Sequence, residues 1–123
     1  MSATQTKKIL VVCSQVPSKG NLAREALDAA FAVAAFEQSV CIYFSGEGVW
    51  QLLAAQQTNL TTGKAINSSW KAASLYDIVK LYVSDEELAK RNINADELIE
   101  GISVINANDV SDIMTDQDLV LSF

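Results

Sequence analysis

The sequence contains no histidine among its 123 residues. That absence removes the commonest general base, the usual partner of a catalytic nucleophile and the commonest transition-metal ligand. Aromatic residues make up only 7% of the chain, so its core must be built mainly from aliphatic side chains. We therefore predict no catalytic, cofactor-binding or metal-binding residues.

Positive charge is also scarce. The chain has nine Lys and Arg residues and 15 Asp and Glu residues, which gives a net charge of −6 and a pI near 4.4. Such a surface repels phosphate groups, so we expect neither direct nucleic-acid binding nor docking on anionic membranes. Met1–Lys8 is too polar for a leader, and no apolar run approaches the ~18 residues of a membrane span. The expected compartment is the cytoplasm.

There are two cysteines, Cys13 and Cys41, each inside an apolar run. Two thiols at that separation predict neither a disulfide framework nor a zinc motif. Cys41 lies in the middle of its run and is predicted to be a small hydrophobic core residue. Cys13 lies nearer the end of its run, where burial is also the simpler interpretation. Its thiol nevertheless remains a candidate nucleophile.

Half of the residues are hydrophobic, and short apolar runs alternate with helical segments. The runs are continuous, which is typical of strands buried on both faces of a parallel sheet. The predicted strands are Lys8–Ser14, Ser39–Phe44, Ile78–Val83, Ile102–Ile105 and Leu119–Phe123. The predicted helices are Ala26–Phe36, Val49–Ala54, Trp70–Tyr76, Asp85–Arg91 and a last one, capped by Asn108 or Asp109, that ends at Met114. This pattern predicts a single α/β domain over residues 1–123, doubly wound and flavodoxin-like, with a mainly parallel five-stranded sheet and helices on both faces.

Three further features have a simple and a functional interpretation. The loop Ser14–Gly20 follows a strand and precedes a helix, where phosphate binds in doubly wound folds. It matches neither a P-loop nor GxGxxG, so a plain connecting loop is the simpler interpretation. The alternative is a flavodoxin-like module that binds a small ligand.

Helix Ala26–Phe36 is apolar almost all round, which favours a subunit interface. The interface candidates are Phe31, Val49, Trp50 and Leu53. The acidic cluster Asp109, Asp112, Asp116 and Asp118 lacks metal-loop spacing and indicates a solvated face.

The block Gly48-Val49-Trp50-Gln51-Leu52-Leu53 and the tract Leu75-Tyr76-Asp77-Ile78 resemble the DsrE/DsrF-like family of sulfur-relay proteins, closest to its TusC/DsrF branch. The likeness extends to the final Leu121-Ser122-Phe123. The resemblance implies one subunit of a heterohexamer (TusBCD/DsrEFH-like) with two small homologous partners, TusB/DsrH-like and TusD/DsrE-like. Such complexes pass persulfide sulfur along cysteines, for 2-thiolation of tRNA wobble uridines or for intracellular sulfur oxidation. For the chain produced without these partners, the sequence leaves both a monomer and a homo-oligomer open.

In the DsrE/TusD branch the sulfur-carrying cysteine lies just after the third strand, ahead of a helix that resembles Leu88–Asn92. The matching position in this chain is Ser84. A hydroxyl cannot hold a persulfide, so the resemblance implies a non-catalytic accessory subunit, not an enzyme by itself, whose sister subunit carries the sulfur. The alternative is that the chain carries sulfur in its own right through Cys13.

Overall fold

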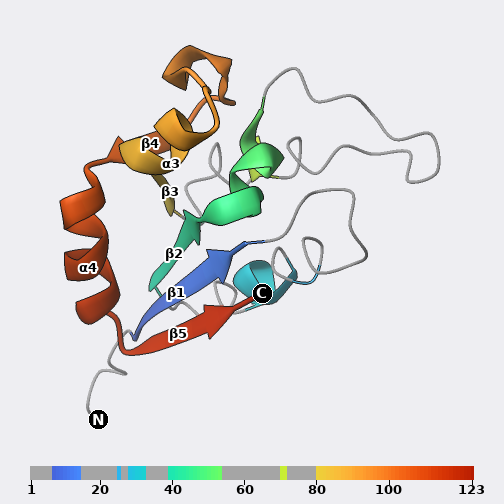
Figure 1. Cartoon of the computed structure of the whole chain (residues 1–123). Coiled ribbons are helices and arrows are strands. Elements are labelled where there is room, and N and C mark those ends of the chain that lie inside the picture. The colour runs from blue at the N-terminus through green and yellow to red at the C-terminus, as the bar shows by residue number, and fades with distance from the viewer. Residues whose placement is uncertain (1–6, 15–24, 26–27, 33–38, 54–69, 72–79) are drawn as a thin grey trace, which may run out of the picture.

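A computed structural model describes residues 7–14, 25, 28–32, 39–53, 70–71 and 80–123. The described strands are β1 (Lys8–Cys13), β2 (Ser39–Phe44), β3 (Lys80–Ser84), β4 (Ile102–Ile105) and β5 (Leu119–Ser122). They form one sheet in the order β4-β3-β2-β1-β5, in which every neighbouring pair is parallel (Figure 1). The predicted α/β class with a parallel five-stranded sheet is therefore confirmed.

The strand order decides which helices cover which face. From β1 to β4, each strand is added next to the previous one in the same direction across the sheet. β5 instead pairs with the other edge of β1. Because crossovers between parallel strands are right-handed, the β4–β5 connection must cross the face opposite to the earlier connections. That connection contains α4 (Ala107–Thr115). In the described part of the chain, α4 is the helix on this second face.

The core lies on the first face. Val11, Ile42, Phe44 and Val83 point into it from the strands, and Leu88 closes it from α3 (Asp85–Lys90). The indole ring of Trp70 meets Phe44 edge-on, with ring centroids 5.1 Å apart. Its Nε1 donates to the buried Gln51 Oε1 at 2.8 Å, so the one polar atom of this aromatic pair is satisfied inside the core.

Two local predictions about helix starts were wrong. The segment expected as a helix from Val49 is a 3₁₀ helix, η1 (Gly46–Leu52), which begins three residues earlier because Gly46 adopts φ +52 and so turns the chain at once. The last helix is capped by Asn106, whose side chain accepts from the Asn108 N–H at 2.9 Å. Asn106 has the extended backbone of an N-cap residue directly after β4, so the helix starts before the predicted caps.

The other boundaries are close to those predicted. β2 and β4 have the predicted ends, whereas β1, α3 and β5 each end one residue early. β3 (Lys80–Ser84) and α4 (Ala107–Thr115) each end one residue late. A short 3₁₀ turn, η2 (Ala95–Glu97), follows α3. Residues 28–32 of the predicted helix Ala26–Phe36 and residues 70–71 of the predicted helix Trp70–Tyr76 are helical. The rest of those helices, the start of the third strand before Lys80 and residues 54–69 lie outside the described residues.

Candidate functional site

Ser84 ends β3 and caps α3 at the carboxyl edge of the sheet. Its side-chain oxygen accepts from the Glu87 N–H at 3.1 Å, and only 2% of the residue is exposed. Burial raises the pKa of the neighbouring Tyr43, and a side-chain hydrogen bond with Ser84 partly offsets that rise. The Ser84 hydroxyl is thus used inside the protein, where it fixes the start of a helix.

A polar network joins α3 to the turn after β2. One oxygen of Glu87 accepts from the Gly46 N–H at 2.9 Å, and the other lies 3.1 Å from Arg91 Nη1. The Arg91 guanidinium also lies 3.2 Å from Glu47 Oε2, which accepts from Trp50 Nε1 at 3.1 Å. The network therefore holds the turn and the helix in one arrangement beside Ser84.

Cys13 lies beneath that turn. A Cβ atom on Gly48 would fall 2.0 Å from the Cys13 carbonyl oxygen, so only glycine allows the turn to approach β1 this closely. The Cys13 side chain is 1% exposed. Burial raises the pKa of its thiol to about 12. At neutral pH this cysteine is a protonated core residue, which is the simpler of its two predicted interpretations.

Ser14 is the described end of the predicted phosphate loop. Both its N–H and its hydroxyl donate to the Phe123 carbonyl oxygen at 3.0 Å, so they tie the loop to the last residue after β5. Residues 15–20 lie outside the described residues. The described geometry at Ser14 is that of a structural connection.

The interface candidates differ in exposure. Phe31, Trp50 and Leu53 are partly buried and pack at the margin of the core. Val49 is 0% exposed. Its side chain fills the chain's own core and leaves no atom for a partner to contact, whereas the other three have free surface.

Cys41 is not the core residue that its apolar run predicted. Its side chain is half-buried and faces the second side of the sheet, where it lines a pocket of about 560 Å³ under α4. Burial raises the pKa of its thiol, and the nearby Lys80 and Lys8 ammonium groups oppose that rise. The continuous apolar run wrongly predicted a fully buried Cys41, because α4 covers its face of the sheet only in part.

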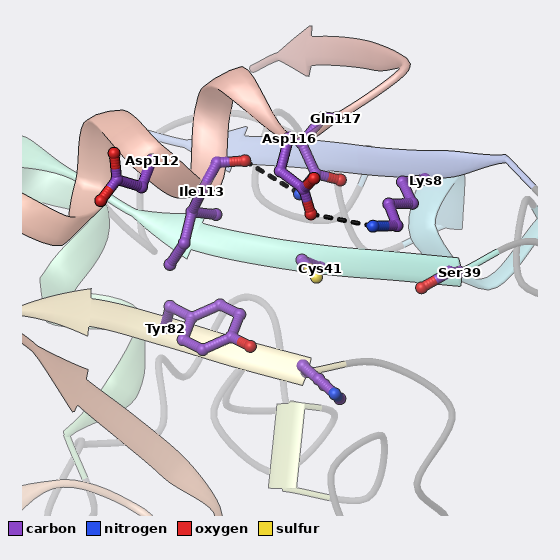
Figure 2. A pocket seen from close by; sticks show the side chains of 9 residues that line it. Lys8, Ser39, Cys41, Tyr82, Asp112, Ile113, Asp116 and Gln117 are labelled. Atoms are coloured by element: carbon purple, nitrogen blue, oxygen red, sulfur yellow. Dashed lines mark hydrogen bonds and ion pairs between the residues drawn. The ribbon is translucent and has the colours of Figure 1, made fainter.

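The pocket lies at the amino ends of the first three strands. Lys8, Ser39 and Lys80, the first residues of β1, β2 and β3, line it together with α4 residues. Lys8 Nζ lies 2.9 Å from Asp116 Oδ2. Figure 2 shows the Cys41 side chain on β2, with this ion pair on one side and the Tyr82 ring on the other. The acidic residues predicted as a solvated face (Asp109, Asp112, Asp116 and Asp118) are all exposed.

Two groupings escaped sequence reasoning. Glu47, Glu87 and Arg91 are far apart in the chain, and only the Glu87–Arg91 spacing of four residues on a helix signalled a pair. For the Cys41 pocket the sequence offered only a weak indication: alternation along a strand places Ser39 and Cys41 on the same face of the sheet.

Within the described ranges, no three Cys, Asp or Glu side chains gather as a metal site would require. No helix among the same residues has the length and apolar character needed to cross a membrane.

The parallel sheet, its return strand β5 and the capped α3 place the chain among α/β domains with a DsrE-like architecture. The E. coli ychN protein has the same fold, with a TM-score of 0.83 at 19% identity over 96% of this chain and all of that one. A family model described as the DsrE/DsrF-like family matches residues 7–123. The chain therefore belongs to the DsrE/DsrF-like family.

Among the curated relatives are proteins named TusC and DsrF. A TusC homolog of Vibrio vulnificus is 31% identical over 87% of this chain and 91% of its own length. The protein TusC of Buchnera aphidicola is 30% identical over 95% of this chain and 99% of its own. The intracellular sulfur oxidation protein DsrF of Allochromatium vinosum is 29% identical over 95% of this chain and 96% of its own. These relatives match the TusC/DsrF branch indicated by the sequence.

Proposed function

We propose that the chain is a non-catalytic subunit of a sulfur-relay complex, in which a homologous partner carries the persulfide. The observation that carries this proposal is Ser84, which stands where the related branch has its carrier cysteine. Its oxygen is buried and accepts the Glu87 N–H, so this position holds a helix cap in place of a sulfur atom. The sulfur passed on serves either tRNA wobble-uridine 2-thiolation or intracellular sulfur oxidation.

The first rival is that Cys13 accepts the sulfur. A persulfide forms when a thiolate attacks a sulfur donor, which needs a low pKa and access to solvent. Cys13 has neither, because burial raises its pKa to about 12 and its side chain is 1% exposed. Its position under the Gly48 turn supports a structural role.

The partners we propose are two small homologous subunits in a heterohexamer. Phe31, Trp50 and Leu53 remain interface candidates on the first side of the molecule. Strand β5 adds a second surface, since it is an edge strand with no charged residue and with Leu119 49% and Val120 43% exposed. Natural edges without charge are usually covered, which supports a partner subunit at this one.

The experiment is a tagged pull-down from the native host followed by native mass spectrometry. We expect two small homologues in equal amounts, one of them with a cysteine at the position of Ser84. A Val120→Lys variant should co-purify less of them, whereas the exposed control Ser103→Ala should not differ from the wild type. A homo-oligomer without such partners would overturn the proposal.

A second experiment follows the sulfur. The isolated chain and the purified complex are incubated with a persulfide donor, and each subunit is weighed by mass spectrometry. We expect added sulfur on the partner alone. Sulfur on Cys13 of the native chain would instead support the rival function.

A further inference from the structure

Strand β4 forms the edge of the sheet opposite β5 (Figure 1). In the part of the chain that the structure describes, it pairs with β3 on one side and with no strand on the other. Its four residues, Ile102–Ile105, include no charged side chain. Because the backbone N–H and C=O groups of alternate residues point away from β3, this edge can pair with another extended chain. The subunit interfaces proposed above do not use this edge.

The cover over the core face ends between β3 and β4. Val83 and Val104 are paired in register on these two strands, so their side chains share that face of the sheet. Val83 is 0% exposed, whereas Val104 is 41% exposed. The aliphatic face that is buried on β3 therefore opens to solvent on β4.

A groove of about 550 Å³ lies beside this open valine. Val104 forms part of its apolar wall together with Leu88 and Ile93, which are both buried. The remaining lining residues are Asp85, Ala89, Asn92, Asn94 and Ala95. A strand added to β4 would continue the sheet, and every second side chain of that strand would point toward the groove.

The charge of the groove is of one sign. Asp85 lines it, and among the described residues no Lys or Arg does so. Asp85 Oδ1 accepts from the Ala107 N–H at 3.2 Å, which places this side chain beside the carboxyl end of β4. Its other oxygen has no hydrogen-bond partner within the described residues. The groove therefore suits a chain that is aliphatic over Val104 and cationic near Asp85.

A second copy of the chain fits this edge poorly. In an antiparallel pair of two β4 strands, the carboxyl end of each strand lies beside the amino end of the other. Asp85 of one copy would then face Glu100, which precedes β4 in the other copy. Like charges that oppose each other across a strand pair are destabilising, so the occupant is a different chain.

We propose that the β4 edge binds an extended segment of a partner protein by strand addition. The main chain of the segment pairs with β4, an aliphatic side chain packs on Val104 in the groove, and a Lys or Arg side chain pairs with Asp85. The site is independent of the sulfur-relay role, because it uses neither the Ser84 side chain nor the β5 surface.

The probes are labelled hexapeptides in which a polar residue alternates with valine. One alternates Lys with Val, a second Gln with Val and a third Glu with Val. A fourth has the Lys–Val sequence with N-methyl groups on its central residues, which keep the side chains and charges but block strand pairing. Fluorescence anisotropy with the full-length chain measures the dissociation constants. We expect Lys–Val to bind most tightly, Gln–Val less and Glu–Val least, and the methylated peptide not to bind saturably.

Two pairs of variants locate the site. Val104→Lys should weaken Lys–Val binding at least about tenfold, because it removes the aliphatic contact and adds a like charge. Ser103→Lys adds the same charge on the opposite face of β4 and should bind as the wild type does. Asp85→Asn should weaken Lys–Val binding about two- to fivefold, the effect of one exposed ion pair, and leave Gln–Val binding unchanged. Its control is Glu86→Gln, which removes the same charge outside the groove.

All four positions are exposed, so an unchanged urea midpoint verifies that the variants fold. Hydrogen exchange of the wild-type chain locates the peptide without any substitution. The Lys–Val peptide should slow amide exchange in the fragment that contains Ile102–Ile105, whereas its methylated form should not.

Three results would overturn the proposal. If the Lys–Val peptide does not bind saturably, or if its methylated form binds equally well, the edge accepts no added strand. Slowed exchange outside β4, or an equal loss of binding in Ser103→Lys and Val104→Lys, would place the contact elsewhere. A dimer of the chain alone that Val104→Lys abolishes in native mass spectrometry would mean that a second copy covers this edge.

Discussion

The Glu87 carboxylate accepts a hydrogen bond from the backbone N–H of Gly46 at 2.9 Å, across 41 positions of sequence. Its other oxygen lies 3.1 Å from Arg91 Nη1. One side chain thus ties the turn after β2 to α3, next to Ser84 at the helix start. The carboxyl edge beside Ser84 is therefore held by polar contacts between side chains and backbone.

Glu87→Ala should lower the free energy of unfolding by about 1–3 kcal/mol, because it leaves the Gly46 N–H and the Arg91 guanidinium without their acceptor. The measurement is a urea titration of the purified chain. Glu86→Ala is the matched control: its partner Lys90 also stands four residues away, but the Glu86 side chain is 59% exposed. That pair should contribute only about 0.3–0.5 kcal/mol. Equal effects of the two variants would contradict the role given to Glu87.

Gly48→Ala should be far more harmful than Gly46→Ala. The new Cβ at Gly48 would meet the Cys13 carbonyl oxygen at 2.0 Å, and backbone must move to admit it. At Gly46 the nearest atom lies 3.9 Å away, so only the φ of +52 opposes alanine, at a cost of about 1–2 kcal/mol. Yield of folded protein and urea midpoints provide the comparison. The expectation fails if Gly48→Ala is as stable as Gly46→Ala.

Cys13 should make the protein less stable in alkaline solution. Its thiol ionises near the ordinary value of 9.0 in the unfolded chain, and burial raises its pKa to about 12 in the folded one. Between these values the folded state holds a proton that the unfolded state has lost, so rising pH favours unfolding, by at most about 1.4 kcal/mol per pH unit. Below pH 9.0 this contribution to stability is fully present.

Urea titrations across that alkaline range measure the slope, and Cys13→Ala should make it shallower. Burial also raises the pKa of Tyr43, which adds to the slope with the same sign in both proteins. The variant therefore isolates the thiol. An unchanged slope would mean that Cys13 is solvated in the folded state.

Ser84→Ala should cost about 1 kcal/mol of unfolding free energy, the usual effect of losing an N-cap oxygen. Ser103→Ala, at an exposed position of the neighbouring β4, should stay within about 0.5 kcal/mol of the wild type. In the purified complex, Ser84→Ala should leave sulfur loading of the partner unchanged. Loss of loading in a fully assembled complex would assign Ser84 a direct part in the transfer.

The positions of the strands were largely predictable, because each is a local apolar run. β2 and β4 have their predicted ends, and α3 begins at its predicted residue, Asp85. The start of η1 was not predictable from hydrophobicity, since the positive φ of Gly46 sets it. The cap of α4 was missed because Asn106, Asn108 and Asp109 are all good caps in sequence, and only the end of β4 selects the first.

The sequence by itself determined that the chain is a parallel α/β domain, that histidine chemistry is absent, and that residue 84 carries a hydroxyl. These properties follow from residue type and local pattern. The tertiary structure decided the strand order β4-β3-β2-β1-β5 and, through right-handed crossovers, that α4 covers the second face. That topology brings Cys41, Lys80 and Asp112 to one pocket, while the chain's close approach at Gly48 buries Cys13. Both outcomes depend on contacts between segments far apart in sequence, which local patterns do not encode.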